Sequence, residues 1–186
     1  MLTKRIKTGL RRFFRDELGN ASLEAVIFIP LMLTVLTATF TFHDAFRQKS
    51  LNTKAAFTIS DALSRETDPI NDAYLDGMVE MMEYLTRSSG PYSLRVSVVR
   101  YNAKQDKYLV DWSRTRGDFA RLRHKDLPSM YQDLPKLLHN ERIIVVETGT
   151  DYSAPFFVDG FVTDDLFYNM AFTRPRFAPQ LLWQNG

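Results

Sequence analysis

The pattern of hydrophobic and polar residues separates one long apolar segment from an amphipathic remainder. Residues 21–42 form a run of 22 residues with a single ionisable side chain, Glu24. As a helix rising about 1.5 Å per residue, this run spans roughly 33 Å, enough to cross a hydrocarbon core of about 30 Å. The pattern therefore predicts a transmembrane helix, in which Pro30 favours a kink.

The helical pattern continues beyond the apolar run. Apolar residues recur at spacings of three and four up to Leu63, and Thr67-Asp68-Pro69 predicts that the helix stops near Glu66. We expect the face that carries Phe57 and Ile59 to pack on the protein's own sheet. A second helix is predicted from a cap at Asn71 or Asp72 to about Arg87. Its apolar stripe consists of Tyr74, Leu75, Met78, Met81, Met82 and Leu85.

Alternating residues in the second half of the chain indicate strands. Strands are predicted at residues 92–98 and 108–112, with a short loop near residues 103–106 between them. A short helix is expected at residues 129–139, a central strand at residues 142–148 and a last strand at residues 166–172. The fold class is therefore α+β, with a long N-terminal helix, a second helix and a mostly antiparallel sheet of about four strands.

The distribution of charge argues against a nucleic-acid partner. The first nineteen residues hold six basic and two acidic side chains, whereas the whole chain has a net charge of +2, so the remainder has a net charge of −2. A nucleic-acid-binding protein is expected to carry its positive field on the folded domain. The chain also contains no cysteine, which excludes disulfides and thiolate metal sites.

The basic residues before the apolar run predict its orientation. By the positive-inside rule, the N-terminus stays in the cytoplasm and the chain after His43 is exported. A conventional signal peptide has an apolar core of about 7–15 residues followed by a small-residue cleavage site. The apolar run here is longer, and the sequence HDAFRQKS that follows it lacks such a site.

A second pattern surrounds the start of the apolar run. A basic stretch ends at Gly19, the apolar run follows at once, and Glu24 is the fifth residue counted from Asn20. A cut between Gly19 and Asn20 would create an α-amino cation four residues from Glu24, on the same or a neighbouring chain. An uncut signal anchor, in which Gly19 and Glu24 occur by chance, is the alternative explanation.

These residues resemble the leader of type IV prepilins and pseudopilins, and most closely the TadE/TadF-like proteins of tight-adherence (Tad) pilus systems. A looser similarity lies in residues 143–147, Tyr152, Pro155 and residues 174–176. The sequence departs from the family in having Ala25 after the glutamate, where an aromatic residue is common, and Asn20 at the first mature position.

The resemblance implies a non-enzymatic pilus-assembly protein with three parts. Residues 1–19 would be a leader removed by a prepilin peptidase, residues 20–43 a single span of the bacterial inner membrane, and residues 44–186 a periplasmic α+β domain. The implied function is that of a minor pilin or pseudopilin, for which Glu24 sets the register with a neighbouring chain. The implied partners are the inner membrane, the prepilin peptidase, other pilins and Tad assembly proteins, in or beside the pilus fibre.

Two other functions remain open at this stage. One is an uncleaved single-pass protein whose periplasmic domain binds a ligand or interacts with the envelope. The other is a periplasmic enzyme released by a signal peptidase, but no G-x-S-x-G, P-loop or H-E-x-x-H motif occurs. The three histidines, His43, His124 and His139, are far apart. Asp159, Asp164 and Asp165 are candidate calcium ligands or ordinary solvated acids.

Overall fold

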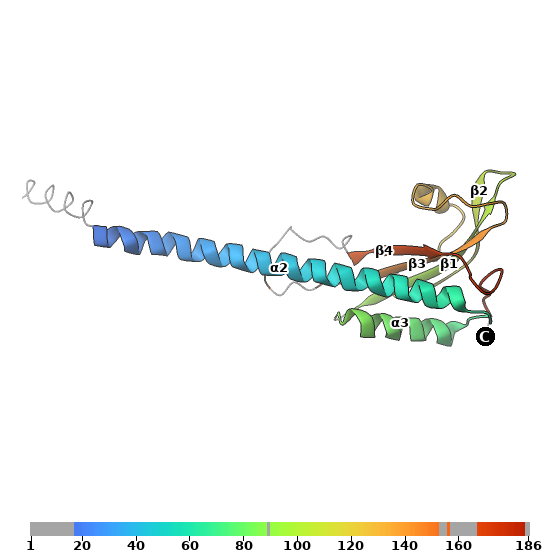
Figure 1. Ribbon diagram of the computed structural model, residues 1–186, viewed down its shortest axis with the longest axis horizontal. Helices are drawn as coiled ribbons and strands as arrows, with labels where there is room; N and C mark the ends of the chain where they lie inside the picture. Colours follow the sequence, from blue (N-terminus) through green and yellow to red (C-terminus); the bar gives the residue numbers. More distant parts are fainter. Residues whose placement is uncertain (1–16, 89, 153–155, 157–166, 185–186) are drawn as a thin grey trace, which may run out of the picture.

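The long first helix extends well beyond the rest of the molecule. The computed structural model describes residues 17–88, 90–152, 156 and 167–184. Helix α2, Glu17–Arg65, is one helix of 49 residues. Its first half projects away from the other elements and its second half packs against them (Figure 1). The predicted end of the helix near Glu66 is thereby confirmed.

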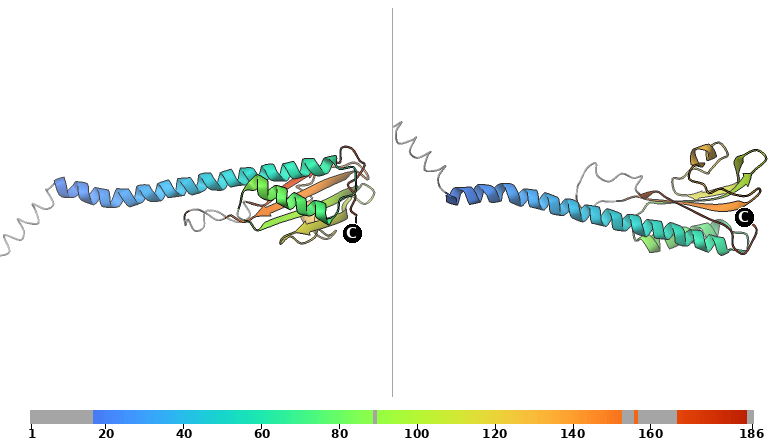
Figure 2. Two further views of the ribbon diagram at one scale, coloured as in Figure 1. Left: turned by 90° about the horizontal axis from the view of Figure 1, so that it is seen from below. Right: turned by 45° about the horizontal axis from the view of Figure 1, so that its top comes forward.

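Pro30 does not interrupt α2. The helix continues through the proline and curves gently along its length (Figure 2). A proline has no N–H, so the carbonyl of Val26 lacks its usual intrahelical donor, which costs one hydrogen bond without ending the helix.

Helix α3, Asp72–Thr86, begins and ends at recognisable caps. The side chain of Asn71 accepts a hydrogen bond from the backbone N–H of Tyr74 at 3.0 Å, which confirms the predicted N-cap. At the other end, Arg87 adopts the left-handed conformation with φ 53°, and its N–H donates to the carbonyl of Glu83. The predicted apolar stripe is confirmed, because Leu75, Met78 and Met82 are buried.

The described part of the chain contains a four-stranded antiparallel sheet with the order β2-β1-β3-β4. The strands are β1, Tyr92–Asn102; β2, Lys107–Arg116; β3, Arg142–Thr150; and β4, Asn169–Thr173. The predicted α+β class and the central position of the strand at residues 142–148 are confirmed.

The two faces of the sheet belong to separate apolar cores. On one face, α2 and α3 bury residues that include Ile59, Leu63, Val96 and Ile144. On the other face, the segment between β2 and β3 covers a second core, which includes Val99, Leu122, Leu127, Leu134, Leu137 and Val145. Strand β1 is therefore covered on both faces, whereas the alternation of its residues suggested a half-buried strand.

Two local expectations are wrong. Residues 129–139 form no α-helix; a short 3-10 helix, Leu127–Met130, and successive turns replace it. Pro135 supplies no N–H and disfavours helical geometry at Leu134, so the segment turns instead of continuing. Phe57, which was expected in the core, is 58% exposed, although Ile59 on the same helix is fully buried.

Candidate functional site

The projecting half of α2 is an exposed apolar rod, here called the arm and defined as residues 22–40. Its large apolar side chains are more than half exposed, with Val26 at 72% and Met32 at 70%. Among the described residues, α2 is the one helix long and apolar enough to cross a membrane, and it lies near the N-terminus. The exposed apolar side chains of the arm are Leu23, Val26, Ile27, Phe28, Ile29, Leu31, Met32, Leu33, Val35, Leu36 and Phe40.

The threonine hydroxyls of the arm bond to the backbone of the same helix. The hydroxyls of Thr34, Thr37 and Thr39 donate to carbonyls four residues earlier, at 2.8–2.9 Å. Hydrocarbon offers no water to unpaired donors, and leaving one unpaired there costs several kcal/mol, or about 2–7 kcal/mol by transfer measurements. The threonines are therefore compatible with a lipid environment.

The residues of the predicted cleavage site lie at the start of this helix. Gly19 and Asn20 fall within the first turn of α2, which begins at Glu17. Glu24 follows one turn later, is exposed, and has no pairing partner among the described side chains. The structure thus places Glu24 on the open surface of the arm.

The arm meets the domain at a defined set of contacts. The ring of Phe40 packs edge-on against Phe156, with 5.7 Å between centroids. The hydroxyl of Tyr152 donates to Asp44 at 2.9 Å, and its ring stacks on Phe167 at 4.8 Å. Burial, followed by the hydrogen bond to Asp44, raises the pKa of Tyr152 to about 12. Thr41, one residue after the arm ends, is buried, with an exposed fraction of 2%.

Beyond this junction, a layer of polar side chains joins α2 to the sheet. The buried Asn52 donates to Thr150, and Thr53 donates to Asn169 at 2.8 Å. Gln48 donates to the carbonyl of Thr86, the last residue of α3, at 3.2 Å. The sequence analysis missed this layer, because its polar residues interrupt the apolar pattern of α2 and their partners lie far away in the chain.

A buried charged cluster lies on the sheet face opposite the helices. Glu147 is fully buried, accepts a bidentate pair from Arg95 on the adjacent strand, and accepts the Tyr168 hydroxyl at 2.6 Å. Burial and the bond to Glu147 raise the pKa of Tyr168 above its ordinary value. Phe119 packs beside Arg95 and Tyr168. Arg95, Glu147 and Tyr168 are engaged with one another, so the geometry of the cluster fits a structural role.

The basic residues at positions 114–125 differ in their surroundings. Arg116 bonds to Asp72 and Asp76 of α3, at 2.7 and 2.5 Å. Arg114 lies over the ring of Trp183, and Trp112 donates to the carbonyl of Leu181 at 2.9 Å. Both arginines are therefore engaged within the domain. The basic residues that remain exposed are Arg121, Arg123 and Lys125.

The histidine and aspartate side chains considered as metal ligands are not brought together among the described residues. His43 and His124 are exposed, and His139 accepts a hydrogen bond from the N–H of Ala103 at 3.2 Å. Within the described ranges, no group of three histidine, aspartate or glutamate side chains is arranged to hold a metal ion. The proposed calcium ligands Asp159, Asp164 and Asp165, and also Pro155, lie outside the described residues.

Comparisons with protein-family models, with curated proteins and with solved structures found no match to this chain.

Proposed function

We propose that this chain is a minor pilin or pseudopilin-type component of a Tad-like pilus assembly system. In this proposal a prepilin peptidase cuts after Gly19, the arm holds the mature protein in the bacterial inner membrane, and the α+β domain lies in the periplasm. The observation that carries the proposal is the continuity of α2, whose exposed apolar arm leads without a break into the core of the domain. The choice of a Tad-like system rests on the resemblance of the leader residues to TadE/TadF-like proteins.

Glu24 has a specific role in this proposal. A carboxylate near the start of a membrane helix is costly to bury, and a nearby cation offsets that cost. Cleavage creates such a cation at the amino group of Asn20. Because Glu24 is exposed and unpaired among the described side chains, it is available to the amino terminus of a neighbouring pilin. This ion pair would set the axial register between two packed arms.

The cleavage is tested by the intact mass of membrane-purified protein from cells with an active prepilin peptidase. We expect loss of residues 1–19 and a new terminus at Asn20. The variant Gly19→Arg should retain the leader, because a long side chain replaces the bare backbone next to the cut, whereas Gly9→Arg should be processed normally. Protein that still begins at Met1 in these cells would refute the proposal.

The role of Glu24 is tested by Glu24→Gln, which keeps the shape of the side chain and removes its charge. We expect normal cleavage but loss of co-purification with other pilins from detergent-solubilised membranes. Ser22→Ala on the same exposed stretch is the matched control. Co-purification of the glutamine variant at the wild-type level would show that no register-setting ion pair exists.

One observation favours the alternative of an uncleaved protein that binds a ligand. A hollow of about 400 Å³ lies beside β4 and is lined by Pro135, Ile143, Phe172, Thr173, Arg174 and Arg176. Its two arginines are paired with Glu141 at 2.5 Å and Asp61 at 3.1 Å, so their charge is already compensated. Under this alternative, Phe172→Ala would abolish binding of an envelope component that co-purifies with the domain, while the protein retains Met1.

A further inference from the structure

The junction between arm and domain carries an aromatic side chain from a segment far away in the chain. Phe156 belongs to the segment between β3 and β4, yet its ring packs against Phe40 of the arm. Phe156 is 45% exposed and Phe40 is 54% exposed. The two rings therefore form a small, open aromatic surface beside α2.

Tyr152, four residues before Phe156, also contacts α2 at this level. Its hydroxyl donates to Asp44, and its ring stacks on Phe167. Phe167 is buried, with an exposed fraction of 1%. The Phe40–Phe156 and Tyr152–Asp44 contacts therefore join two residues that follow β3 to the same part of α2.

The helix itself gives the level of this surface relative to a bilayer. Residues 21–40 span about 30 Å, which is the thickness of a typical hydrocarbon core. Phe40 then lies at the edge of the hydrocarbon, and the first ionisable residue beyond it, His43, lies about 4.5 Å further along the axis. Phe46 follows, with an exposed fraction of 62%. Phenylalanine is among the apolar side chains that interfacial protein surfaces bury at the boundary between headgroups and acyl chains.

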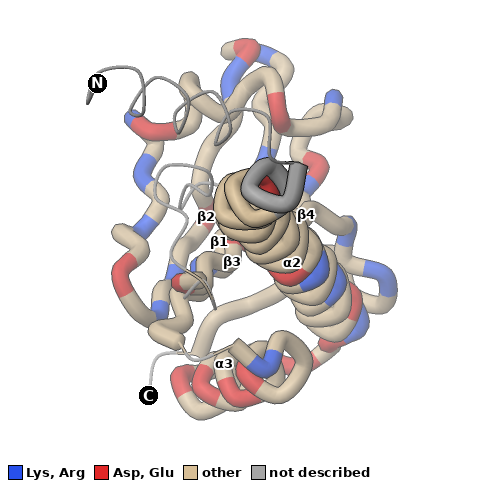
Figure 3. Tube along the Cα trace, turned by 90° about the vertical axis from the view of Figure 1, so that its left-hand side faces the viewer, with Lys and Arg blue, Asp and Glu red and all other residues tan. Residues whose placement is uncertain are grey.

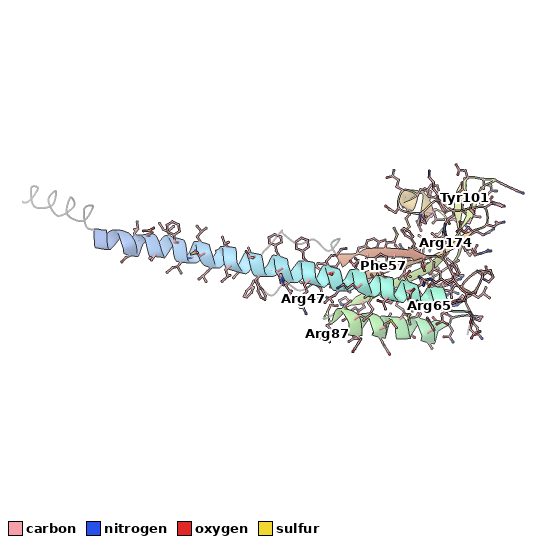
Figure 4. The ribbon with its side chains drawn as sticks, in the orientation of Figure 1. Arg47, Phe57, Arg65, Arg87, Tyr101 and Arg174 are labelled. Carbon is pink, nitrogen blue, oxygen red and sulfur yellow. The ribbon has the colours of Figure 1, made fainter. Side chains whose placement is uncertain are left out.

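The charged side chains near the junction do not favour binding of an anionic lipid. Asp44 pairs with Arg47 at 3.8 Å, and Arg47 and Arg87 lie at the end of the domain that faces the arm (Figure 4). Seen along α2 from the arm, acidic residues of α3 accompany these basic ones (Figure 3). Because neither sign dominates, contact with a bilayer would rest on the aromatic surface and not on charge.

We propose that Phe156 is a second membrane contact of this protein and inserts into the lipid interface of the leaflet on the domain side, next to Phe40. The occupant of the aromatic surface is phospholipid at the boundary between acyl chains and headgroups. This inference rests on the proposed membrane span of the arm. It adds that the domain contacts the bilayer surface at a second point, beside the helix.

The absence of cysteine from the sequence makes a depth measurement direct. Single cysteines at Leu33, Phe156 and Lys104 are labelled with a small fluorophore in full-length protein in phosphatidylcholine nanodiscs. Quenching is measured with lipids brominated on the acyl chain close to the headgroup. With these lipids we expect quenching at position 156 and no quenching at position 104, in the distal hairpin turn. A second lipid, brominated near the end of the acyl chain, should quench the label at position 33.

The positions separate the two hypotheses. An unquenched label at position 33 would refute the membrane span and with it the proposed function. A quenched label at position 33 with an unquenched label at position 156 would overturn the second contact alone. Equal quenching in nanodiscs with and without phosphatidylglycerol is expected, and quenching that requires the anionic lipid would overturn the aromatic basis.

A second set of variants excludes insertion caused by the label. A fluorophore at Asp151, with Phe156 intact, should be quenched. Adding Phe156→Asp should abolish this quenching, whereas adding Phe177→Asp, at an exposed position on the far side of β4 in the sequence, should not. Far-ultraviolet circular dichroism confirms that each variant is folded. Unchanged quenching in a folded Phe156→Asp variant would show that Phe156 is not the side chain that brings this surface to the lipid.

Discussion

Glu147 is a fully buried carboxylate of β3 that bonds to Arg95 of β1 and to Tyr168, the residue before β4. Removing one partner of a buried ion pair leaves the other charge uncompensated, whereas exposed pairs contribute little. Glu141 and Arg174 form a more exposed pair, in which the glutamate side chain is 21% and the arginine side chain 63% exposed.

Glu147→Gln should lower the free energy of unfolding by about 3 kcal/mol, because it leaves Arg95 without its counter-charge. Glu141→Gln should cost less than about 1 kcal/mol. Urea unfolding of the detergent-solubilised protein, followed by near-ultraviolet circular dichroism, measures both. Equal costs for the two variants would show that the buried pair contributes no more than the exposed one.

Tyr152 predicts a dependence of stability on alkaline pH. Its pKa in the folded protein, about 12, lies above the ordinary value of 10.0 for a tyrosine. The folded state therefore holds the phenol proton more tightly, so this contribution is complete below pH 10 and is lost as the pH rises to about 12. Tyr168, whose pKa is also raised, contributes in the same direction.

Tyr152→Phe should remove the hydrogen bond to Asp44 and destabilise the protein by about 1 kcal/mol at neutral pH. Between pH 10 and 12 the variant should lose less stability than the wild type, because one titrating group is gone. Tyr84→Phe, at a position that is 76% exposed, is the control and should follow the wild-type curve. Parallel curves for Tyr152→Phe and wild type would contradict this assignment.

At the scale of elements, two glycines show how backbone geometry and space decide the effect of the same substitution. Gly77 lies inside α3, and a Cβ there would meet no atom within 4 Å. Gly117 follows β2 with φ +71°, and a Cβ there would come within 2.7 Å of the Ser93 hydroxyl and would collide with the carbonyl of Tyr92.

Gly77→Ala should therefore stabilise the protein by about 0.5–1 kcal/mol through helix propensity. Gly117→Ala should destabilise it by at least about 1 kcal/mol, because the conformation is strained and the strand end must move. Thermal unfolding of the two variants measures the difference. Shifts of the same sign would mean that the turn after β2 adapts without cost.

Local patterns predicted most of the elements, because each pattern belongs to residues close in sequence. The Asn71 cap and the stripe of α3 are of this kind. Residues 129–139 were misread because Leu134 and Leu137 fit a helical spacing, although each fills the second core from a turn. The composition of the arm likewise predicted the long apolar helix of the candidate site. The Tyr152–Asp44 contact joins residues 108 positions apart and leaves no local pattern.

At the scale of the whole molecule, α2 belongs to two environments. Residues 22–40 are exposed and apolar, whereas Ala45, Ala55, Ile59 and Leu63 are buried in the domain. The first core includes three of these four residues, so the domain depends on the second half of the helix and not on the arm.

A fragment of residues 40–186 should accordingly be soluble without detergent and unfold cooperatively in urea. A fragment of residues 67–186 should fail to fold, because it exposes the face of the sheet that α2 covers. Size-exclusion chromatography and circular dichroism distinguish the two outcomes. A fragment of residues 40–186 that precipitates would show that the arm contributes to the fold.

Because α2 is continuous through the junction, a tilt of the arm is transmitted to the domain. A helix of this length is about 73 Å long, so a tilt of 10° about its N-terminal end displaces its domain end by about 13 Å. Helices tilt when their apolar length exceeds the local bilayer thickness. A change in bilayer thickness would thus change the tilt of α2 and, with it, the orientation of the domain and its distal hairpin relative to the membrane.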